Sequence, residues 1–358
     1  MKAREMMGEH GAIGRSEKSG ICLKARCFLC ACAALLAVCL LADAPWGGAC
    51  ASEGGGSSFT PGAQGDFAMC YMPPGLYFRN NVIYTEGTLS DYPSWPGMSP
   101  APTSSKLKSK VWFDLLQIVY SSKLEILGGR YFASVNIPFV LDQKLTTSTT
   151  IPADPTFPAM RDGSHTSGFG DVQLVPFGLL WDMGNFHVLA AQNLVLETGR
   201  YEEDKANNTG RNYFSYDELL GLTWLDEQAG REISLMAGLM INTRNDKTEY
   251  KTGNEFHVDF TFAQYLSKQF GVGIVGYVYN QVTDDKGPAL DAINDFDEFY
   301  GLPAPDGYRS NGAAVGPAII LTPNIGGKDV NIIAKWLHES CDNRLEGEWI
   351  YLSGCVKF

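Results

Sequence analysis

The most constraining feature of this sequence is a rhythm of half-apolar runs separated by linkers that are alternately short and long, from about residue 75 to the C-terminus. The short linkers are 121–123, 182–184, 226–230 and 267–269. The long linkers, rich in Gly, Pro, Asn and Asp, are 87–107, 142–166, 199–212, 244–253 and 284–308. Up-and-down barrels of the outer-membrane type have tight turns at one end and long loops at the other. The rhythm therefore predicts an all-β fold, a closed antiparallel transmembrane β-barrel.

Several runs alternate with a period of two, as a strand with one lipid face and one lumen face must. In 255–266, one face carries Phe256, Val258, Phe260, Phe262 and Leu266, and the other carries Glu255, His257, Asp259, Thr261 and Tyr265. The runs 232–242 and 271–283 alternate in the same way. We expect the apolar faces to meet lipid and the polar faces to line the lumen.

The number of runs fits a closed barrel. We count about twelve, near 75–86, 109–121, 123–140, 168–181, 185–198, 213–225, 231–243, 254–266, 270–283, 310–322, 328–339 and 347–358. An even number places both termini on the short-turn side. The last run ends at Phe358, with Val356, Leu352 and Ile350 on the same face. Such an ending resembles the signal read by outer-membrane assembly machinery, which we expect as a partner.

The N-terminal part precedes the barrel. Residues 1–51 contain Lys24 and Arg26, then an apolar stretch and the small residues 49–51, a pattern typical of a signal peptide. Residues 52–74 form a leader with apolar side chains, among them Phe59 and Phe67. Two alternatives stay open for this leader, a flexible tail and a plug folded into the lumen. The barrel itself is assigned to 75–358, and the expected location is the outer membrane of a bacterial cell.

The charge and the cysteine content of the chain restrict the kinds of ligand and macromolecule that it can bind. Acidic residues outnumber basic ones by 40 to 28, which argues against nucleic acid as a partner and is compatible with loops that face water and lipopolysaccharide.

Beyond the signal peptide only three cysteines remain, Cys70, Cys341 and Cys355, and their spacing is not that of a zinc site. Cys70 precedes the first strand and Cys355 lies in the last, and these strands adjoin in a closed barrel. A disulfide between them and two free thiols are both open. No metal or cofactor is expected.

Catalytic motifs are sparse. The sequence has no Gly-x-Ser-x-Gly, His-Glu-x-x-His or P-loop motif. His257, between Glu255 and Asp259 on the polar face of one run, can be a hydrated lumen wall or part of a site. The leading prediction is therefore a channel and not an enzyme. Two alternatives are a barrel-embedded lipid-modifying enzyme, using His257 and Asp259 or His338 and Glu339, and a structural or adhesive barrel displaying the loops 142–166 and 284–308.

The candidate residues of the lumen and solute path share a position on the polar faces of the runs. They are Arg130, Asp171, Gln173, Asp217, Thr223, Glu232, Asn242, His257, Asp259, Tyr277, Tyr279 and Gln281. This mixture of aromatic and polar groups favours weak, multi-site passage of a small apolar solute. A twelve-stranded barrel has a lumen between the side-chain-filled eight-stranded kind and the open porins.

Several short motifs carry a family resemblance. The segment 73–84, reading PPGLYFRNNVIY, and the segment 168–177, reading GFGDVQLVPF, are similar to strands of the family named for the meta-pathway of phenol degradation. Further similarity lies in 197–201, 208–212, 276–281, Gly316-Pro317 and 343–347. The resemblance implies an outer-membrane β-barrel with a role in passing small hydrophobic or aromatic compounds. That family has no catalytic motif to transfer.

Overall fold

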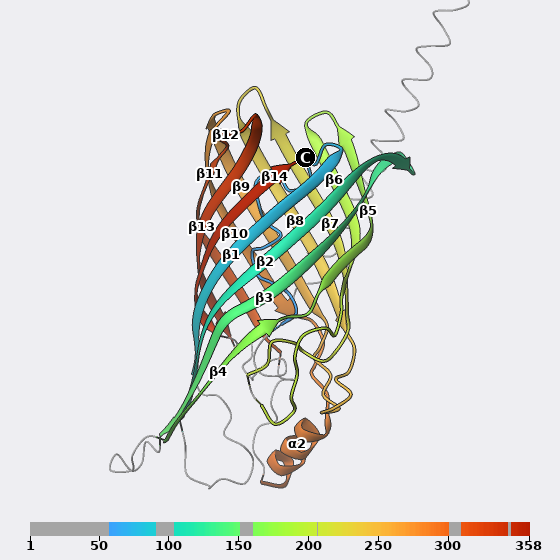
Figure 1. Cartoon of the computed structure of the whole chain (residues 1–358). Helices are drawn as coiled ribbons and strands as arrows, with labels where there is room; N and C mark the ends of the chain where they lie inside the picture. The colour runs from blue at the N-terminus through green and yellow to red at the C-terminus, as the bar shows by residue number, and fades with distance from the viewer. Residues whose placement is uncertain (1–56, 91–103, 151–159, 206, 301–308, 343–344) are drawn as a thin grey trace, which may run out of the picture. The chain divides into compact units, whose positions relative to one another are not determined.

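The computed structural model describes residues 57–90, 104–150, 160–205, 207–300, 309–342 and 345–358 (Figure 1). The first strands are β1 (Gly75–Ser90), β2 (Ser104–Ile126), β3 (Gly129–Thr150), β4 (Met160–Phe169), β5 (Gln173–Met183), β6 (Phe186–Val195) and β7 (Ser215–Asp226). Then follow β8 (Arg231–Asn242), β9 (Glu255–Ser267), β10 (Phe270–Gln281), α2 (Pro288–Tyr300), β11 (Asn311–Leu321), β12 (Asn324–Ile325), β13 (Lys328–Asp342) and β14 (Glu346–Lys357). The predicted signal peptide lies outside the described residues.

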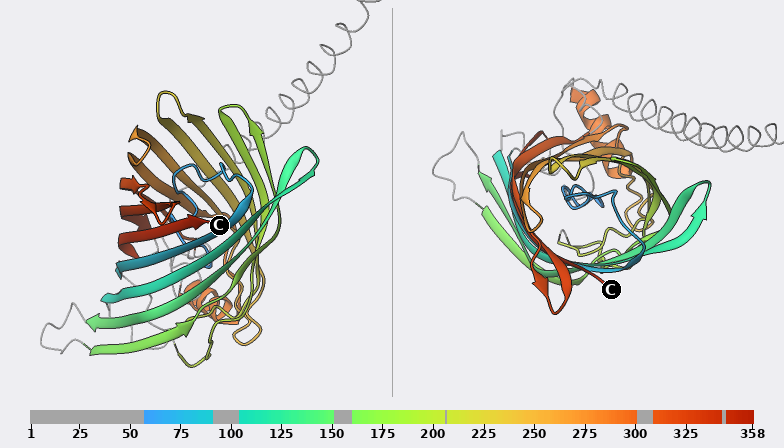
Figure 2. Two further views of the ribbon diagram at one scale, coloured as in Figure 1. Left: turned by 45° about the horizontal axis from the view of Figure 1, so that its top comes forward. Right: turned by 90° about the horizontal axis from the view of Figure 1, so that it is seen from above.

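The strands form one closed antiparallel ring. Neighbours along the chain pair from β5 to β11, and β1 pairs with both β2 and β14. β13 joins β14 to β11 and so closes the barrel, as the axial view in Figure 2 shows. β4 and β5 both pair with β3, at different heights, and together occupy one position in the wall. Counted this way the barrel has 12 strands, so the predicted fold class is confirmed.

The short turns lie at one end of the barrel, and the long loops and α2 lie at the other (Figure 1). One predicted turn is wrong. Residues 121–123 belong to β2, which continues to Ile126, and the chain turns at Leu127 and Gly128. Leu127 and Gly128 both have positive φ, 53° and 74°. Glycine adopts such an angle without strain, which suits Gly128 to this turn. The pairing of β2 with β3 is irregular between Ser121 and Glu125, so the polar residues mark a bulge.

Two of the predicted long loops contain regular structure. Most of 142–166 extends the β3–β4 hairpin, because β3 continues to Thr150 and β4 begins at Met160. The run 145–150, LTTSTT, is rich in β-branched residues, which favour strands. The loop 284–308 contains α2, which begins at Pro288, a residue suited to the first turn of a helix. Among the described residues, no helix is both long and apolar enough to cross a membrane.

The two faces of the wall differ in chemistry in the way the alternation predicts. Large apolar side chains point outward and are exposed, including Ile233, Ile241, Phe262, Ile274 and Leu352. Their neighbours along the strands point inward and are buried, many of them polar or charged. A soluble protein has the opposite arrangement, whereas an outer-membrane barrel requires an apolar exterior and a polar interior.

Candidate functional site: the lumen

Residues 57–74, named here the lumen segment, run inside the ring formed by the strands (blue in Figure 2). Phe59, Phe67 and Cys70 of this segment are almost fully buried. Backbone–backbone hydrogen bonds of the lumen segment, among the described residues, are two turn bonds of its own, Ala63 to Thr60 and Tyr71 to Ala68. The lumen segment is therefore not a strand of the sheet.

Side chains of the wall hold its backbone instead. The Asp259 carboxylate accepts hydrogen bonds from the backbone N–H of Gly62 at 3.3 Å and of Gln64 at 2.9 Å. Glu232 accepts one from Ala68 N–H at 2.6 Å, and Thr261 donates to the Gly65 carbonyl at 2.8 Å. Three neighbouring positions on β8 and β9 thus satisfy polar backbone groups that would be costly to bury unpaired.

Opposite charges fix the middle of the segment. The Asp66 carboxylate lies between Arg79 of β1 and Lys335 of β13, with ion pairs to both. The Lys335 ammonium also donates to the Gly62 carbonyl. All three charged side chains are largely removed from solvent, and Asp66 is the carboxylate that pairs directly with both cations.

The end of the segment is held where it enters β1. The Met72 carbonyl accepts hydrogen bonds from Ser121 Oγ at 3.0 Å and from Arg130 Nη2 at 2.8 Å. Arg130 also contacts the Asp182 carboxylate at 2.7 Å. Arg130, predicted as a lumen residue, therefore anchors the lumen segment at the short-turn end of the barrel.

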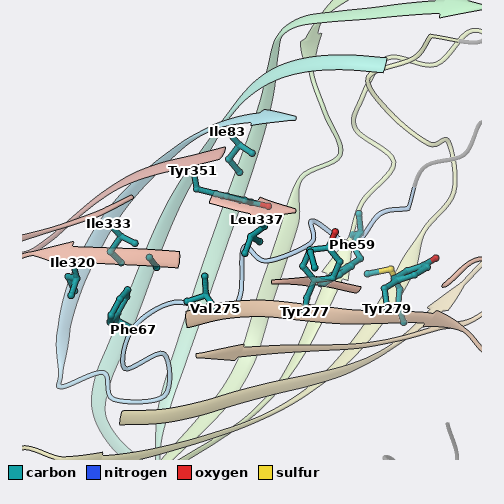
Figure 3. Packing of buried hydrophobic residues seen from close by; sticks show 14 residues of the cluster. Phe59, Phe67, Ile83, Val275, Tyr277, Tyr279, Ile320, Ile333, Leu337 and Tyr351 are labelled. Carbon is teal, nitrogen blue, oxygen red and sulfur yellow. The ribbon is translucent and has the colours of Figure 1, made fainter. Parts of the chain in front are cut away.

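The apolar side chains of the segment fill two clusters. Phe59 and Phe67 join Ile83, Tyr277, Tyr279, Leu337 and Tyr351 in the first, shown in Figure 3. Cys70, Met69 and Met72 join residues of β2, β3, β5, β6 and β8 in the second. The lumen is thus packed like a small core, and the segment supplies its centre.

The ring of Phe59 occupies a position among aromatic wall residues. It stacks on the His257 imidazole, with ring centroids 3.9 Å apart and planes 21° apart. It lies nearly parallel to Tyr279, with ring centroids 6.2 Å apart, and forms a T-shaped pair with Tyr277, with ring centroids 6.3 Å apart. His257 and Tyr279 face each other across the β9–β10 ladder. We call the position enclosed by His257, Tyr277 and Tyr279 the aromatic slot.

His257 is fully buried within this arrangement. Its Nε2 contacts Asp217 Oδ1 of β7 at 3.1 Å. Its Nδ1 is buried and has no hydrogen-bond partner among the described residues. Asp259, its neighbour on the same face, is engaged by the backbone of the lumen segment.

The structure brings most of the predicted lumen residues together. Those that are almost fully buried on the inner face are Asp217, Thr223, Glu232, Asn242, His257, Asp259, Tyr277, Tyr279 and Gln281. Gln173 is half-buried at the start of β5 and accepts a hydrogen bond from Asn136. Asp171 lies between β4 and β5 and accepts hydrogen bonds from the backbone of Gly199 and Arg211, so it holds a loop.

Sequence reasoning missed part of the site. Arg79 and Lys335 are charged residues on the inner faces of their strands. The alternation of their runs could have identified both as lumen residues. Their common partner, Asp66, stands in a leader without periodicity, so no pattern pointed to it. Trp349 also belongs to the inner face, where it donates a hydrogen bond to Glu339 at 2.8 Å.

Cys70 and Cys355 are both free thiols in the structure, which is the second of the two alternatives that the sequence left open. Cys70 lies against Thr223 and Gly221 of β7. Cys355 lies on β14, opposite Arg79 of β1. The lumen segment crosses the barrel before it enters β1, which carries Cys70 away from the closing strands. Among the described residues, no group of His, Cys, Asp and Glu is arranged to hold a metal ion.

The loops around the mouth are tied to one another. Gly199 and Gly210 approach so closely that a Cβ on Gly199 would lie 2.5 Å from the Gly210 Cα. Asp285, next to α2, accepts hydrogen bonds from Gly253 N–H and Gln281, each at 2.7 Å. In the loop before β7, burial raises the pKa of Tyr213 to about 12, so its phenol stays protonated at neutral pH. These loops therefore form a packed collar at the long-loop end.

Comparison with known proteins fits the fold. A family model described as "Putative MetA-pathway of phenol degradation" matches residues 95–353. The chain belongs to this family. The predicted resemblance is thus confirmed, and the match covers the barrel from the first long loop to the last strand.

A solved structure of an outer membrane channel agrees at the level of the fold. The crystal structure of an outer membrane channel from Pseudomonas putida F1 is similar to the present chain, with a TM-score of 0.58 and 14% sequence identity. The match covers 84% of the present chain and 100% of the channel. A FadL homologue from Pseudomonas aeruginosa matches with a TM-score of 0.39 and 10% identity, over 87% and 98% of the two chains. A comparison with curated proteins gives no match.

Proposed function

We propose that this protein is an outer-membrane channel of a bacterium, and that it admits small hydrophobic or aromatic molecules. The supporting observation is the construction of the lumen. A closed wall surrounds a segment that belongs to no strand and that, among the described residues, is held by side chains of the wall. Such a segment can leave the lumen without breaking the sheet, because the wall keeps all of its backbone hydrogen bonds.

The chemistry of the inner wall supports a solute with an apolar or aromatic body. Tyr277, Tyr279 and Tyr351 are buried on this face, beside Phe113 and Trp349. Polar groups alternate with them, including Glu232, Asp217 and Gln281. Aromatic faces offer contact area, and the polar groups limit how tightly an apolar molecule is retained. Conduction needs this balance between entry and release.

Similar proteins point in the same direction. The matching structure from Pseudomonas putida F1 is described as an outer membrane channel, and the family is described by phenol degradation. These similarities support transport through a channel and a small aromatic compound as the solute.

Specific contacts weigh against the lipid-modifying enzyme. His257 is enclosed by Phe59 and Asp217 on the inner face, whereas membrane lipid meets the outer face. His338 contacts Glu348 at 2.7 Å and is exposed, while Glu339 accepts a hydrogen bond from the inward Trp349. Adjacent strand residues point to opposite faces, so His338 and Glu339 do not converge on one substrate.

Permeability of the reconstituted barrel tests the proposal. We would compare the chain without residues 1–51 and the same chain lacking 52–74, by single-channel recording and by liposome swelling with phenol-sized polar solutes. We expect low conductance of the first and a marked increase in the second. If both proteins fold correctly and neither makes the membrane permeable, the proposed channel function is wrong.

A matched deletion separates the channel from the adhesive barrel. Removing 288–300, which spans α2, leaves the strands and the lumen segment intact. A channel keeps its conductance after this deletion. If the phenotype of the cell is lost while permeability is unchanged, the displayed loop carries the function and the proposal fails.

A further inference from the structure

We propose that the aromatic slot is a binding subsite for a single aromatic ring, occupied by Phe59 when the lumen segment is seated. An aromatic solute in the lumen then competes with Phe59 for the same position. This inference rests on the proposed function for the route of the solute, and it adds a defined subsite and a mechanism of release.

The first argument is the geometry around the Phe59 ring. Its centroid lies 3.9 Å from the centroid of the His257 imidazole in a stacked arrangement, and it forms an edge-to-face contact with Tyr277. Offset-stacked and edge-to-face arrangements are the two favoured contacts of aromatic rings. A planar ring thus fits the slot better than a bulkier alicyclic ring of similar size.

The second argument is that the walls of the slot are fixed independently of Phe59. His257 is held by Asp217, and the Tyr279 hydroxyl accepts a hydrogen bond from Ser310 at 3.2 Å. His257 and Tyr279 are paired residues of two adjacent strands, and Tyr277 is paired with Asp259. The wall therefore keeps its shape when Phe59 is removed, which a binding site requires.

The third argument is an unsatisfied atom. His257 Nδ1 is buried without a hydrogen-bond partner among the described residues, and a phenyl side chain has no polar atom to offer. Native proteins rarely leave such atoms unpaired. A solute with a hydroxyl on an aromatic ring, or a water molecule carried with it, supplies what Phe59 lacks.

The last argument concerns how the slot is emptied. Phe59 lies near the start of the lumen segment, between the hydrogen bond that Ser57 donates to Glu255 and the one that the Pro61 carbonyl accepts from Tyr351. The stronger charged contacts lie further along, at Asp66. The ring can therefore leave the slot first, while Asp66 still holds the rest of the segment. Ring exchange then becomes the initial step of opening.

Binding to the purified full chain in lipid nanodiscs tests the subsite. The probes are benzyl alcohol and cyclohexylmethanol, which share size and hydroxyl group and differ in the ring. We expect Phe59→Ala to bind benzyl alcohol at least about tenfold more tightly than the native chain, because the internal competitor is gone. We expect that variant to prefer benzyl alcohol over cyclohexylmethanol by about two- to twelvefold, the range that aromatic pairs provide.

Phe67→Ala is the matched control. Phe67 is also a buried aromatic residue of the lumen segment in the same cluster, but its ring contact is with Tyr265, at 6.0 Å. The cavity left there should bind both probes alike. Equal binding of the two probes by Phe59→Ala would overturn the subsite. Conductance of Phe59→Ala tests the channel function separately from the subsite. If this variant conducts but shows no preference for the aromatic ring, the subsite is wrong and the channel function is retained.

A second measurement uses the native chain and does not depend on a variant that folds. Cys70 is fully buried in the lumen segment, so a membrane-impermeant maleimide labels it only after the segment moves. Peptide mass spectrometry identifies the labelled cysteine. Benzyl alcohol should accelerate labelling of Cys70, and cyclohexylmethanol at equal concentration should not. Equal acceleration by both probes, or by neither, contradicts competition for the slot.

Discussion

Lys335 of β13 contacts Asp66 of the lumen segment at 2.6 Å, and this ion pair joins two residues that are 269 positions apart in the sequence. Arg79 of β1 contacts the same carboxylate. β1 and β13 flank β14, so the three charged residues tie the lumen segment to the strands that close the barrel. Release of the segment must separate these charges.

The first prediction follows from this cluster. Asp66→Asn removes the carboxylate that pairs with both buried cations, and losing one partner of a buried ion pair costs about 3–5 kcal/mol. The barrel can avoid this cost by releasing the segment and hydrating the lumen. We expect the rate of Cys70 labelling by maleimide to rise by about 100-fold or more, together with higher conductance.

Asp284→Asn is the control for the first prediction. Asp284 forms an ion pair of 2.7 Å with Arg309, but both side chains are partly exposed at the long-loop end. Surface pairs contribute only about 0–1 kcal/mol, so labelling of Cys70 should stay unchanged. If Asp66→Asn also leaves labelling unchanged, the charge cluster does not hold the segment.

The second prediction concerns a turn of the lumen segment. Gly62 has φ of +72°, and a Cβ there would lie 2.8 Å from Leu337 Cδ1, a side chain that is fully buried. Gly62→Ala therefore adds both backbone strain and a clash inside the lumen. We expect faster Cys70 labelling with a barrel that still folds, as judged by its shifted migration in unheated gel samples.

Gly184→Ala is the control for the second prediction, because it adds backbone strain without a side-chain clash. Gly184 has φ of +69° in the β5–β6 turn, and a Cβ there meets nothing within 4 Å. The left-handed strain is about 1–2 kcal/mol in both variants. Labelling should respond to Gly62→Ala alone. Equal responses would show that the contact with Leu337 is irrelevant to seating.

The third prediction tests the wall. Gly316 of β11 lies so close to β13 that a Cβ would stand 1.8 Å from the Trp336 carbonyl oxygen. Gly316→Ala must push two paired strands apart, and we expect a loss of more than about 4 kcal/mol of stability, the level of severe clashes. Gly354→Ala on the outer face of β14 meets nothing within 4 Å and should be neutral. Urea unfolding of both variants in lipid vesicles measures the difference.

The sequence was sufficient for the wall and insufficient for its contents. Alternation by two placed His257, Asp259 and Tyr277 on one face, because every strand of a barrel must separate lipid from lumen. The same reasoning failed for the lumen segment, since its contacts depend on side chains from distant strands and follow no period. It also failed at α2, where a short exposed helix needs no apolar stripe against a core.

The last prediction concerns orientation in the membrane. The termini of the barrel, at Gly75 and Lys357, lie at the same end as the turns at 127–128 and 268–269. In outer-membrane barrels that end faces the periplasm, and the long loops face the exterior. Trypsin added to intact cells should therefore cut at Lys286 or Arg309, which flank α2, because exposed loops are the sites of nicking. Lys268 should be spared in sealed cells and cut only after the outer membrane is permeabilised. Lys123 should be spared in both conditions, since it lies within β2 and not in a turn. Cleavage at Lys268 in sealed cells would mean that the barrel is inserted with the opposite orientation.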